Sequence, residues 1–146
     1  SFHILAQKLL KKHKPFFKLL AYRVIMDKHG HDGHNIVEAS VKLEVHEEIV
    51  HTVAEGDGPV HALDRAFRGA LTKFYPVIAE VRLVDYKVRI LDSASGTAAK
   101  TRVIIESTDG KETWGTVGVN DNIIEASWEA LVDSVEYKLF KEETPG

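Results

Sequence analysis

HTVAEGDGPVHALDRAFRGALTKFYP, residues 51–76, is the stretch that decides the fold. It places an alternating apolar segment, a Gly-Asp-Gly-Pro turn and an amphipathic segment in direct succession. Proline at position 59 suits the first turn of a helix, where its missing N–H costs nothing. The apolar residues that follow recur at the spacing of one helix face, and they are Leu63, Ala66, Phe67, Ala70, Leu71 and Phe74. The stretch therefore predicts a strand, a turn and a helix that begins at Pro59.

The same plan recurs 64 residues later, in GTVGVNDNIIEASWEALVDSVEYKL, residues 115–139. The second helix is expected to follow Asn122, with Glu125 placed as in a capping box. Its predicted buried stripe consists of Ile124, Trp128, Leu131 and Val135. Matching residues at this offset indicate an internal repeat, and the pairs are Thr52/Thr116, Val53/Val117, Asp57/Asp121, Val60/Ile124, Ala62/Ala126 and Ala66/Ala130.

Three strands are expected before each helix, because short segments there alternate polar and apolar residues. Val84, Tyr86, Val88 and Ile90 should face one way, and Trp114 and Trp128 should lie in the core or at an interface. The segment TDGK is typical of a hairpin turn. The expected strands are residues 16–26, 36–46 and 48–54, and then 81–91, 97–107 and 112–119. The order predicts an α+β fold of two pseudo-symmetric βββα units whose sheets pack against their helices.

The predicted units span residues 16–80 and 81–140 approximately, and together they would form one regulatory domain over residues 16–146. Residues 4–12, ILAQKLLKK, have helical spacing, and Pro15 should end that helix. We expect residues 1–15 to be the end of a helical linker from a part that is not in this chain.

Composition narrows the class of function. The chain has 146 residues, a formal net charge of −3 and no cysteine. A slightly acidic protein has no electrostatic reason to bind nucleic acid or an anionic membrane. No apolar run approaches the ~20 residues that span a bilayer. Without cysteine there is no disulfide and no thiolate metal site, which suits a cytoplasmic protein.

The motifs of common enzymes are missing. A phosphate-binding loop needs Gly-Lys-Ser/Thr, but Gly58 is followed by Pro59 and Val60. A dinucleotide fingerprint needs a glycine where His61 stands. No Gly-x-Ser-x-Gly elbow is present. The sequence therefore predicts no catalytic residue.

Two further groups of polar residues are candidate sites. His29, His31 and His34 could approach a metal, but nothing in the sequence would orient their rings, and we interpret them as a solvated loop. Asp85 and Arg89 could serve acid–base chemistry, but an exposed cross-strand ion pair is the preferred interpretation. We therefore predict neither a metal site nor a cofactor in this domain.

The starts of the two predicted helices remain as a candidate binding site. Backbone N–H groups at a helix start attract anions, and a carboxylate serves as well as a phosphate. Two such starts beside an apolar strand face would suit a small zwitterion with a branched aliphatic side chain. The glycines before each helix could equally reflect turn geometry alone, so both interpretations stay open on the residues alone.

Several motifs in order resemble one known family. EGDGPVHALDRAFRGAL (55–71), FYP (74–76), LVDYKVRIL (83–91), GTAAKTRVIIES (96–107) and WGTVGVNDNIIEASWEALVDSVEYKL (114–139) are similar to the C-terminal regulatory domain of the 2-isopropylmalate synthase and citramalate synthase family. The last motif is more similar to the citramalate synthase branch. The chain departs from the family at His61 and in the histidine-rich loop at 29–34.

The resemblance implies a domain without catalytic residues, belonging to an acyltransferase that condenses acetyl-CoA with a 2-keto acid in a separate barrel holding a divalent metal. It implies a homodimer that binds the pathway's end product, L-isoleucine or L-leucine, at the dimer interface. Carried over by motif, the effector site comprises Gly56, Gly58, Val60, Leu83, Asp85, Tyr86, Ile90, Thr97, Ala98, Ala99, Asn120, Asn122 and Ile123. Isoleucine is the preferred effector; leucine, or a dimerisation module without an effector, are the alternatives.

Overall fold

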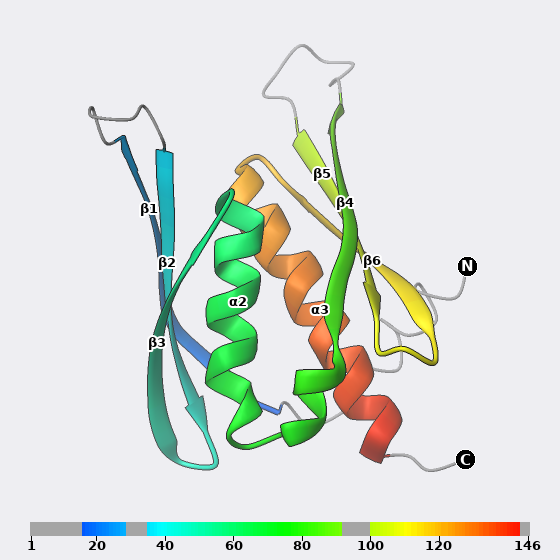
Figure 1. The fold of residues 1–146 in the computed structure, drawn as a ribbon. Helices are drawn as coiled ribbons and strands as arrows, with labels where there is room; N and C mark the ends of the chain where they lie inside the picture. The colour runs from blue at the N-terminus through cyan, green and yellow to red at the C-terminus, as the bar shows by residue number, and fades with distance from the viewer. Residues whose placement is uncertain (1–15, 29–34, 92–99, 144–146) are drawn as a thin grey trace. The chain divides into compact units, whose positions relative to one another are not determined.

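The structure is a computed structural model that describes residues 16–28, 35–91 and 100–143. It divides into two compact units, one ending at residue 76 and one beginning at residue 77. Each unit consists of a three-stranded antiparallel sheet followed by one long helix (Figure 1). The predicted α+β fold of two βββα units is therefore confirmed. The predicted helix at 4–12 and the histidine-rich loop at 29–34 lie outside the described residues.

The first unit contains β1 (Lys18–Lys28), β2 (Asn35–Val45), β3 (Glu48–Gly56) and α2 (Pro59–Thr72). The strands are ordered β1-β2-β3, so β2 is central. Helix α2 packs mainly on β2 and β3. It buries Leu63, Phe67 and their neighbours against the sheet, as the helical spacing predicts. Phe74 lies beyond the helix end and is only half-buried, because α2 ends at Thr72.

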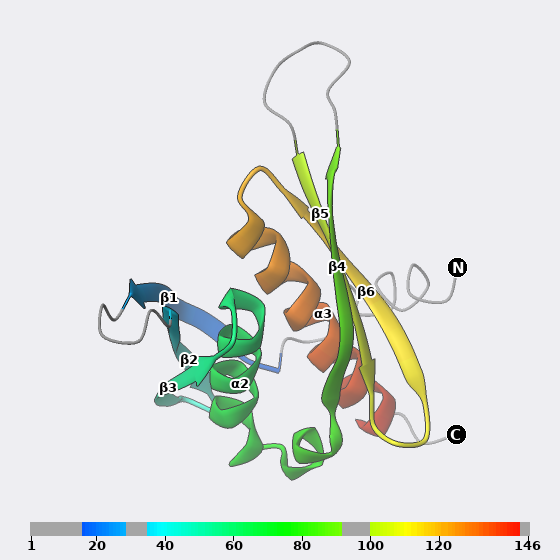
Figure 2. The same cartoon turned by 45° about the horizontal axis from the view of Figure 1, so that its top comes forward.

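The second unit contains a short 3-10 helix η1 (Pro76–Glu80), β4 (Arg82–Leu91), β5 (Lys100–Thr108), β6 (Thr113–Asn120) and α3 (Ile123–Glu143). The strand order is β4-β5-β6. Helix α3 packs on β5 and β6, and Figure 2 shows it lying along one face of its own sheet. Trp114 and Trp128 are buried, whereas Ile124 is only half-buried because it lies in the first turn of α3.

The repeat extends to the hydrogen-bond register of the sheets. Ala39 pairs with Ala54 in the first unit, and the residues 64 positions later, Val103 and Gly118, pair in the second. The hydroxyl of Thr52 donates to the carbonyl of Ala66 at 2.7 Å, and Thr116 donates to Ala130 at the same distance. Each bond ties the edge strand to the middle of its helix.

The first strand of each unit carries a β-bulge at the same place. The register shifts between Leu19 and Ala21 in β1, and between Leu83 and Asp85 in β4. A bulge adds one residue to one strand and so reverses the face of the residues beyond it. The strict alternation predicted for the strand at 81–91 is wrong at this point, because Val84 falls at the bulge.

Candidate functional site

Helix α2 begins without a side-chain cap. Its N-cap is Gly58, in an extended conformation, and Pro59 occupies the first turn. The first intrahelical bond runs from the N–H of Ala62 to the carbonyl of Gly58 at 3.0 Å. No acidic residue lies in the first turn. The positive end of the helix dipole is therefore not offset by a carboxylate of its own first turn.

Helix α3 begins with a cap of its own. The side-chain oxygen of Asn122 accepts from the N–H groups of Ile124 (2.8 Å) and Glu125 (3.3 Å). Glu125 adds an acidic group to the first turn. The predicted capping box is half right: the N–H of Asn122 donates to Asn120 Oδ1 at 3.0 Å instead of to Glu125. The start of α3 is thus already occupied by groups of this chain.

The glycines before α2 differ in their surroundings. A Cβ on Gly56 would lie 2.5 Å from the backbone nitrogen of Ala62, so the strand and the helix approach each other too closely for a side chain. A Cβ on Gly58 would meet nothing within 4 Å. Packing accounts for the glycine at 56, whereas nothing in the packing requires one at 58.

The bulge in β4 gathers apolar side chains on one face. Leu83 pairs with Ser107, and Tyr86 pairs with Ile105. Ser107 and Ile105 are buried, and the Ser107 hydroxyl bonds that of Ser134 in α3, so this face is the one that bears the helix. We define the β4 strip by the apolar residues of β4 on that face, which are Leu83, Tyr86, Val88 and Ile90.

The β4 strip is only partly covered. Tyr86 and Val88 are about two-fifths exposed, and Ile90 is 69% exposed. The cause is geometric, because α3 lies over β5 and β6 and does not extend across β4. An equivalent strip on β1, 64 positions earlier, was not anticipated from the sequence; it comprises Leu19, Tyr22, Val24 and Met26.

The structure brings together only some of the residues predicted for the site. Ile90 and Asn120 lie in one row across the sheet, on either side of Thr101, which is not a predicted site residue. This row lies at the end of the sheet where α3 begins. Leu83 lies seven residues away from Ile90 along β4, which is about 23 Å at ~3.3 Å per residue. Asp85 pairs with Glu106 on the opposite face. Asn122 and Ile123 are exposed at the start of α3. Thr97, Ala98 and Ala99 lie outside the described residues.

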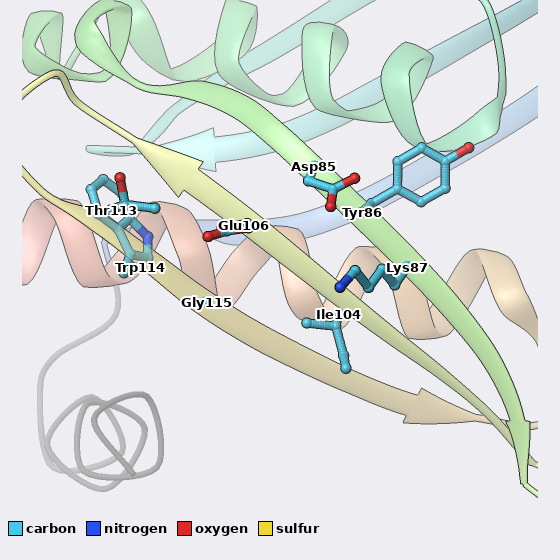
Figure 3. A pocket seen from close by; sticks show the side chains of 8 residues that line it. All are labelled: Asp85, Tyr86, Lys87, Ile104, Glu106, Thr113, Trp114 and Gly115. Atoms are coloured by element: carbon cyan, nitrogen blue, oxygen red, sulfur yellow. The ribbon is translucent and has the colours of Figure 1, made fainter.

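The ion pair predicted for Asp85 and Arg89 is wrong. Directly opposite Asp85 stands Glu106, and opposite Arg89 stands Arg102, so the ladder places like charges across from each other. A hollow of about 210 Å³ lies beside the Asp85–Glu106 pair. Figure 3 shows the residues that line it, which are Asp85, Tyr86, Lys87, Ile104, Glu106, Thr113, Trp114 and Gly115. It is small for a ligand pocket, which commonly encloses ~300–1,000 Å³.

A buried charge cluster at the end of α3 was not predicted. Lys138 Nζ lies 2.8 Å from Asp109 Oδ2, and both side chains are 2% exposed. Lys141 also reaches Asp109 (2.9 Å) and Lys138 reaches Glu142 (2.9 Å). Burial alone would raise the pKa of Asp109, but the hydrogen bonds from the two lysines outweigh it and hold that pKa well below its ordinary value. The cluster joins α3 to the β5–β6 hairpin.

Tyr137 belongs to the same region. It donates a hydrogen bond to Glu112, and burial together with that carboxylate raises the pKa of Tyr137 far above its ordinary value. Lys141 lies 4.9 Å from the centre of the Trp114 ring. Spacing along the sequence gives little sign of the Tyr137–Glu112 and Lys141–Asp109 contacts, because they join residues 25 and 32 positions apart.

The fold and these features define a duplicated βββα domain with one open helix start, two partly exposed apolar strips and no catalytic constellation among the described residues. The sequence model of the LeuA allosteric (dimerisation) domain matches residues 1–139. The chain belongs to that family, and the predicted resemblance is confirmed.

The chain is also similar to curated proteins. It is 52% identical over 143 residues to the (R)-citramalate synthase of Geobacter sulfurreducens, covering 98% of this chain and 27% of that protein. It is 53% identical over 142 residues to the (R)-citramalate synthase of Aquifex aeolicus, covering 94% of this chain and 27% of that protein. Identity to the 2-isopropylmalate synthase of Aquifex aeolicus is 31% over 135 residues, covering 92% and 23%. The chain thus spans about a quarter of the length of these relatives. Within the residues that the structure describes, no helix is long and apolar enough to cross a membrane.

Proposed function

We propose that this chain is the effector-binding domain of a cytoplasmic (R)-citramalate synthase, and that it binds L-isoleucine as a feedback inhibitor at the interface of a homodimer. The parent enzyme would condense acetyl-CoA with pyruvate in a separate, metal-dependent catalytic part. This domain would supply no catalytic group. The higher identity to the citramalate synthases, 52% and 53% against 31%, favours isoleucine over leucine.

The uncapped start of α2 carries the proposal. A free amino acid has a carboxylate, and a helix start that lacks both a capping side chain and an acidic first turn favours that charge. The start of α3 would not serve, because Asn122 already accepts from its N–H groups. We therefore assign the effector's carboxylate to the Gly58–Val60 turn.

We propose that the apolar part of the effector meets the β4 strip at the interface between the two copies. Its exposed members, Tyr86 and Ile90, offer aromatic and branched aliphatic surface to a sec-butyl group. Exposed apolar residues on the helix side of a sheet also favour coverage by a second copy. Isoleucine and leucine differ in the placement of one methyl group, which an apolar pocket distinguishes by only ~1–3 kcal/mol.

Thermal unfolding of the chain with added amino acids tests this function. At a hundred times its dissociation constant, a ligand that binds only the native state adds ~2.7 kcal/mol of stability. For a domain of this size that raises the midpoint by roughly 5–10 °C. Isoleucine should give the largest shift, and leucine and valine smaller ones. If isoleucine raises the midpoint no more than glycine does, the domain would be a dimerisation module without an effector. If leucine raises the midpoint more than isoleucine does, the domain would belong to a 2-isopropylmalate synthase.

The site is tested by two matched substitutions. Gly58→Asp adds a carboxylate where the effector's carboxylate is proposed to lie, and the open space around Gly58 accommodates the side chain. It should abolish the isoleucine shift without lowering the stability of the unliganded domain, because aspartate is a good N-cap. Asn122→Asp adds the same charge at the start of α3 and should leave the shift unchanged. Loss of the shift in both variants would point to a general charge effect and would remove the assignment to α2.

A further inference from the structure

Each sheet has two edge strands. In each unit, one backbone group of the last strand is hydrogen-bonded to a side chain of the helix. In the first unit, Arg65 of α2 donates to the backbone carbonyl of Glu55 in β3 at 3.1 Å. In the second unit, Glu129 of α3 accepts from the backbone N–H of Val119 in β6 at 3.2 Å. These helix positions and these strand positions are each 64 residues apart. A charged helix side chain thus binds the edge strand at the same position in both units, with Arg65 in one and Glu129 in the other. Charged side chains at a sheet edge protect it from pairing with other chains.

The hydrogen bond at Val119 also fixes how the backbone of β4 is oriented. Because Val119 turns its N–H outward, its pair with Arg102 is a non-hydrogen-bonded one. Arg102 therefore turns its backbone groups toward Arg89 of β4. Successive residues of an antiparallel strand alternate in this respect. Val88 consequently turns its N–H and C=O groups away from the sheet.

The edge of β4 is open at that point. Among the residues that the structure describes, no side chain is hydrogen-bonded to the backbone of Val88 or Ile90. The strand from Asp85 to Leu91 lies beyond the bulge, contains no proline and alternates cleanly. An edge strand that is regular, apolar on one face and paired with a neighbouring strand on one side only is a template for pairing with another strand.

We propose that β4 pairs in antiparallel fashion with β4 of a second copy of this chain, centred on Lys87, so that two three-stranded sheets become one continuous sheet across the dimer. This inference rests on the homodimer proposed above and specifies its seam. The centre on Lys87 is favoured by charge, because it places Asp85 of each copy opposite Arg89 of the other. Two opposite-charge pairs then accompany a single Lys87–Lys87 pair.

The neighbouring registers are less favourable. Pairing centred on Val88 would set Lys87 opposite Arg89 twice, which places like charges across the seam. Pairing centred on Tyr86 would also join opposite charges, Asp85 with Lys87 twice, but it would set Val84, the bulge residue, opposite Val88 inside the ladder. The Lys87 register leaves Val84 at the end of the ladder, opposite Ile90. The proposed register also continues the β4 strip of one copy into that of the other, so both strips would share one covered face.

Cysteine crosslinking tests the seam directly, because the chain contains no cysteine. Lys87 belongs to a non-hydrogen-bonded position, where opposed Cα atoms lie ~4.5 Å apart, within the ~4.4–6.8 Å that a disulfide spans. Lys87→Cys should therefore form a disulfide-linked dimer in most of the sample in a mildly oxidising glutathione buffer, reversed by dithiothreitol on a denaturing gel. Asp85→Cys and Arg89→Cys should each fail to crosslink alone and should crosslink when mixed.

The repeat supplies the matched control. Arg23 occupies the position on β1 that Lys87 occupies on β4, and it should crosslink neither with itself nor with Lys87→Cys. Preferential crosslinking between the Arg23→Cys and Lys87→Cys proteins would replace the proposal with a β1–β4 seam. A chain that sediments as a dimer but forms no Lys87→Cys disulfide would overturn the seam alone. A monomer would overturn the seam and the homodimer together, whereas effector binding is judged separately by the melting shift.

Discussion

The hairpin ends of the two units share one backbone plan and have opposite chemistry. In the first unit, the residues where the β2–β3 hairpin meets α2 are apolar and buried; they include Leu43, Val45 and Ala70. Their counterparts 64 positions later are Ser107, Asp109 and Ser134, which lie in a network of hydrogen bonds and ion pairs. The two helix starts differ in the same way, with Gly58 in one and Asn122 in the other.

This comparison shows what the duplication kept and what it changed. Strand register, bulge position and the threonine–helix bond are the same in both units, because they fix the path of the backbone. The side chains at the two ends of each helix differ, because many packings fit the same path. Backbone symmetry is thus retained, and under the proposed function the different helix starts would give the domain one effector site instead of two.

The largest loss of stability is expected from removing Asp109 from the charge cluster at the end of α3. Asp109→Ala leaves the buried amine of Lys138 without its nearest carboxylate, and removing one partner of a buried pair costs ~3–5 kcal/mol. The midpoint of urea unfolding measures it. Replacing both residues, as in Asp109→Leu with Lys138→Met, should recover only part of the loss, because Lys141 and two backbone N–H groups still lose their acceptor. If Asp109→Ala destabilised the fold by less than the loss of an exposed ion pair does, the cluster would not contribute to stability.

The next effect tests how closely each helix approaches its sheet. A Cβ on Gly118 would lie 1.9 Å from the backbone oxygen of Ala126 in α3. The residue 64 positions earlier is Ala54, so the first unit accommodates a Cβ there. Gly118→Ala should cost ~3 kcal/mol, the upper end for overpacking. Gly115→Ala on the same strand meets only an ordinary contact at 3.8 Å and should be tolerated. Equal losses would refute the closer approach of α3.

Acid should affect the second unit through Asp109. The pKa of this carboxyl is held below the value of 3.8 that it has when unfolded. The unfolded chain therefore binds the proton more tightly, so the stabilisation is complete well above pH 3.8 and is lost as the pH falls below about 5. Urea midpoints measured from pH 6 to pH 3 should fall less steeply in Asp109→Asn than in the unchanged chain. Parallel curves would contradict the assignment.

The smallest effect compares the helix starts. Asn122→Ala removes the cap of α3 and should cost ~1 kcal/mol. Gly58→Ala removes no side-chain cap and meets no neighbouring atom, but alanine is a poorer N-cap than glycine, so it should cost somewhat less than Asn122→Ala. Thermal midpoints of the two variants without effector give the comparison. A larger loss at Gly58 would mean that α2 depends on a contact that its open surroundings do not show.

Local patterns predicted most of the fold. Helical spacing and Pro59 located α2, and Asn122 located the start of α3, because helix starts depend on neighbouring residues. The bulge in β4 was not predictable, since no residue type marks it, and it decides that Leu83 shares a face with Tyr86. The Asp109–Lys138 pair was missed for another reason: it joins residues 29 positions apart. The site residues carried over from the family resemblance stay predictions, and of these the proposed site leaves out Asn122 and Ile123 at the capped start of α3.

Titration calorimetry of L-isoleucine tests the central claim, that only one of the two duplicated helix starts binds the effector's carboxylate. The unchanged chain should bind one isoleucine per chain. Asn122→Asp should keep that stoichiometry, and Gly58→Asp should show no binding heat. Two molecules per chain, or binding that survives in Gly58→Asp and disappears in Asn122→Asp, would contradict the account.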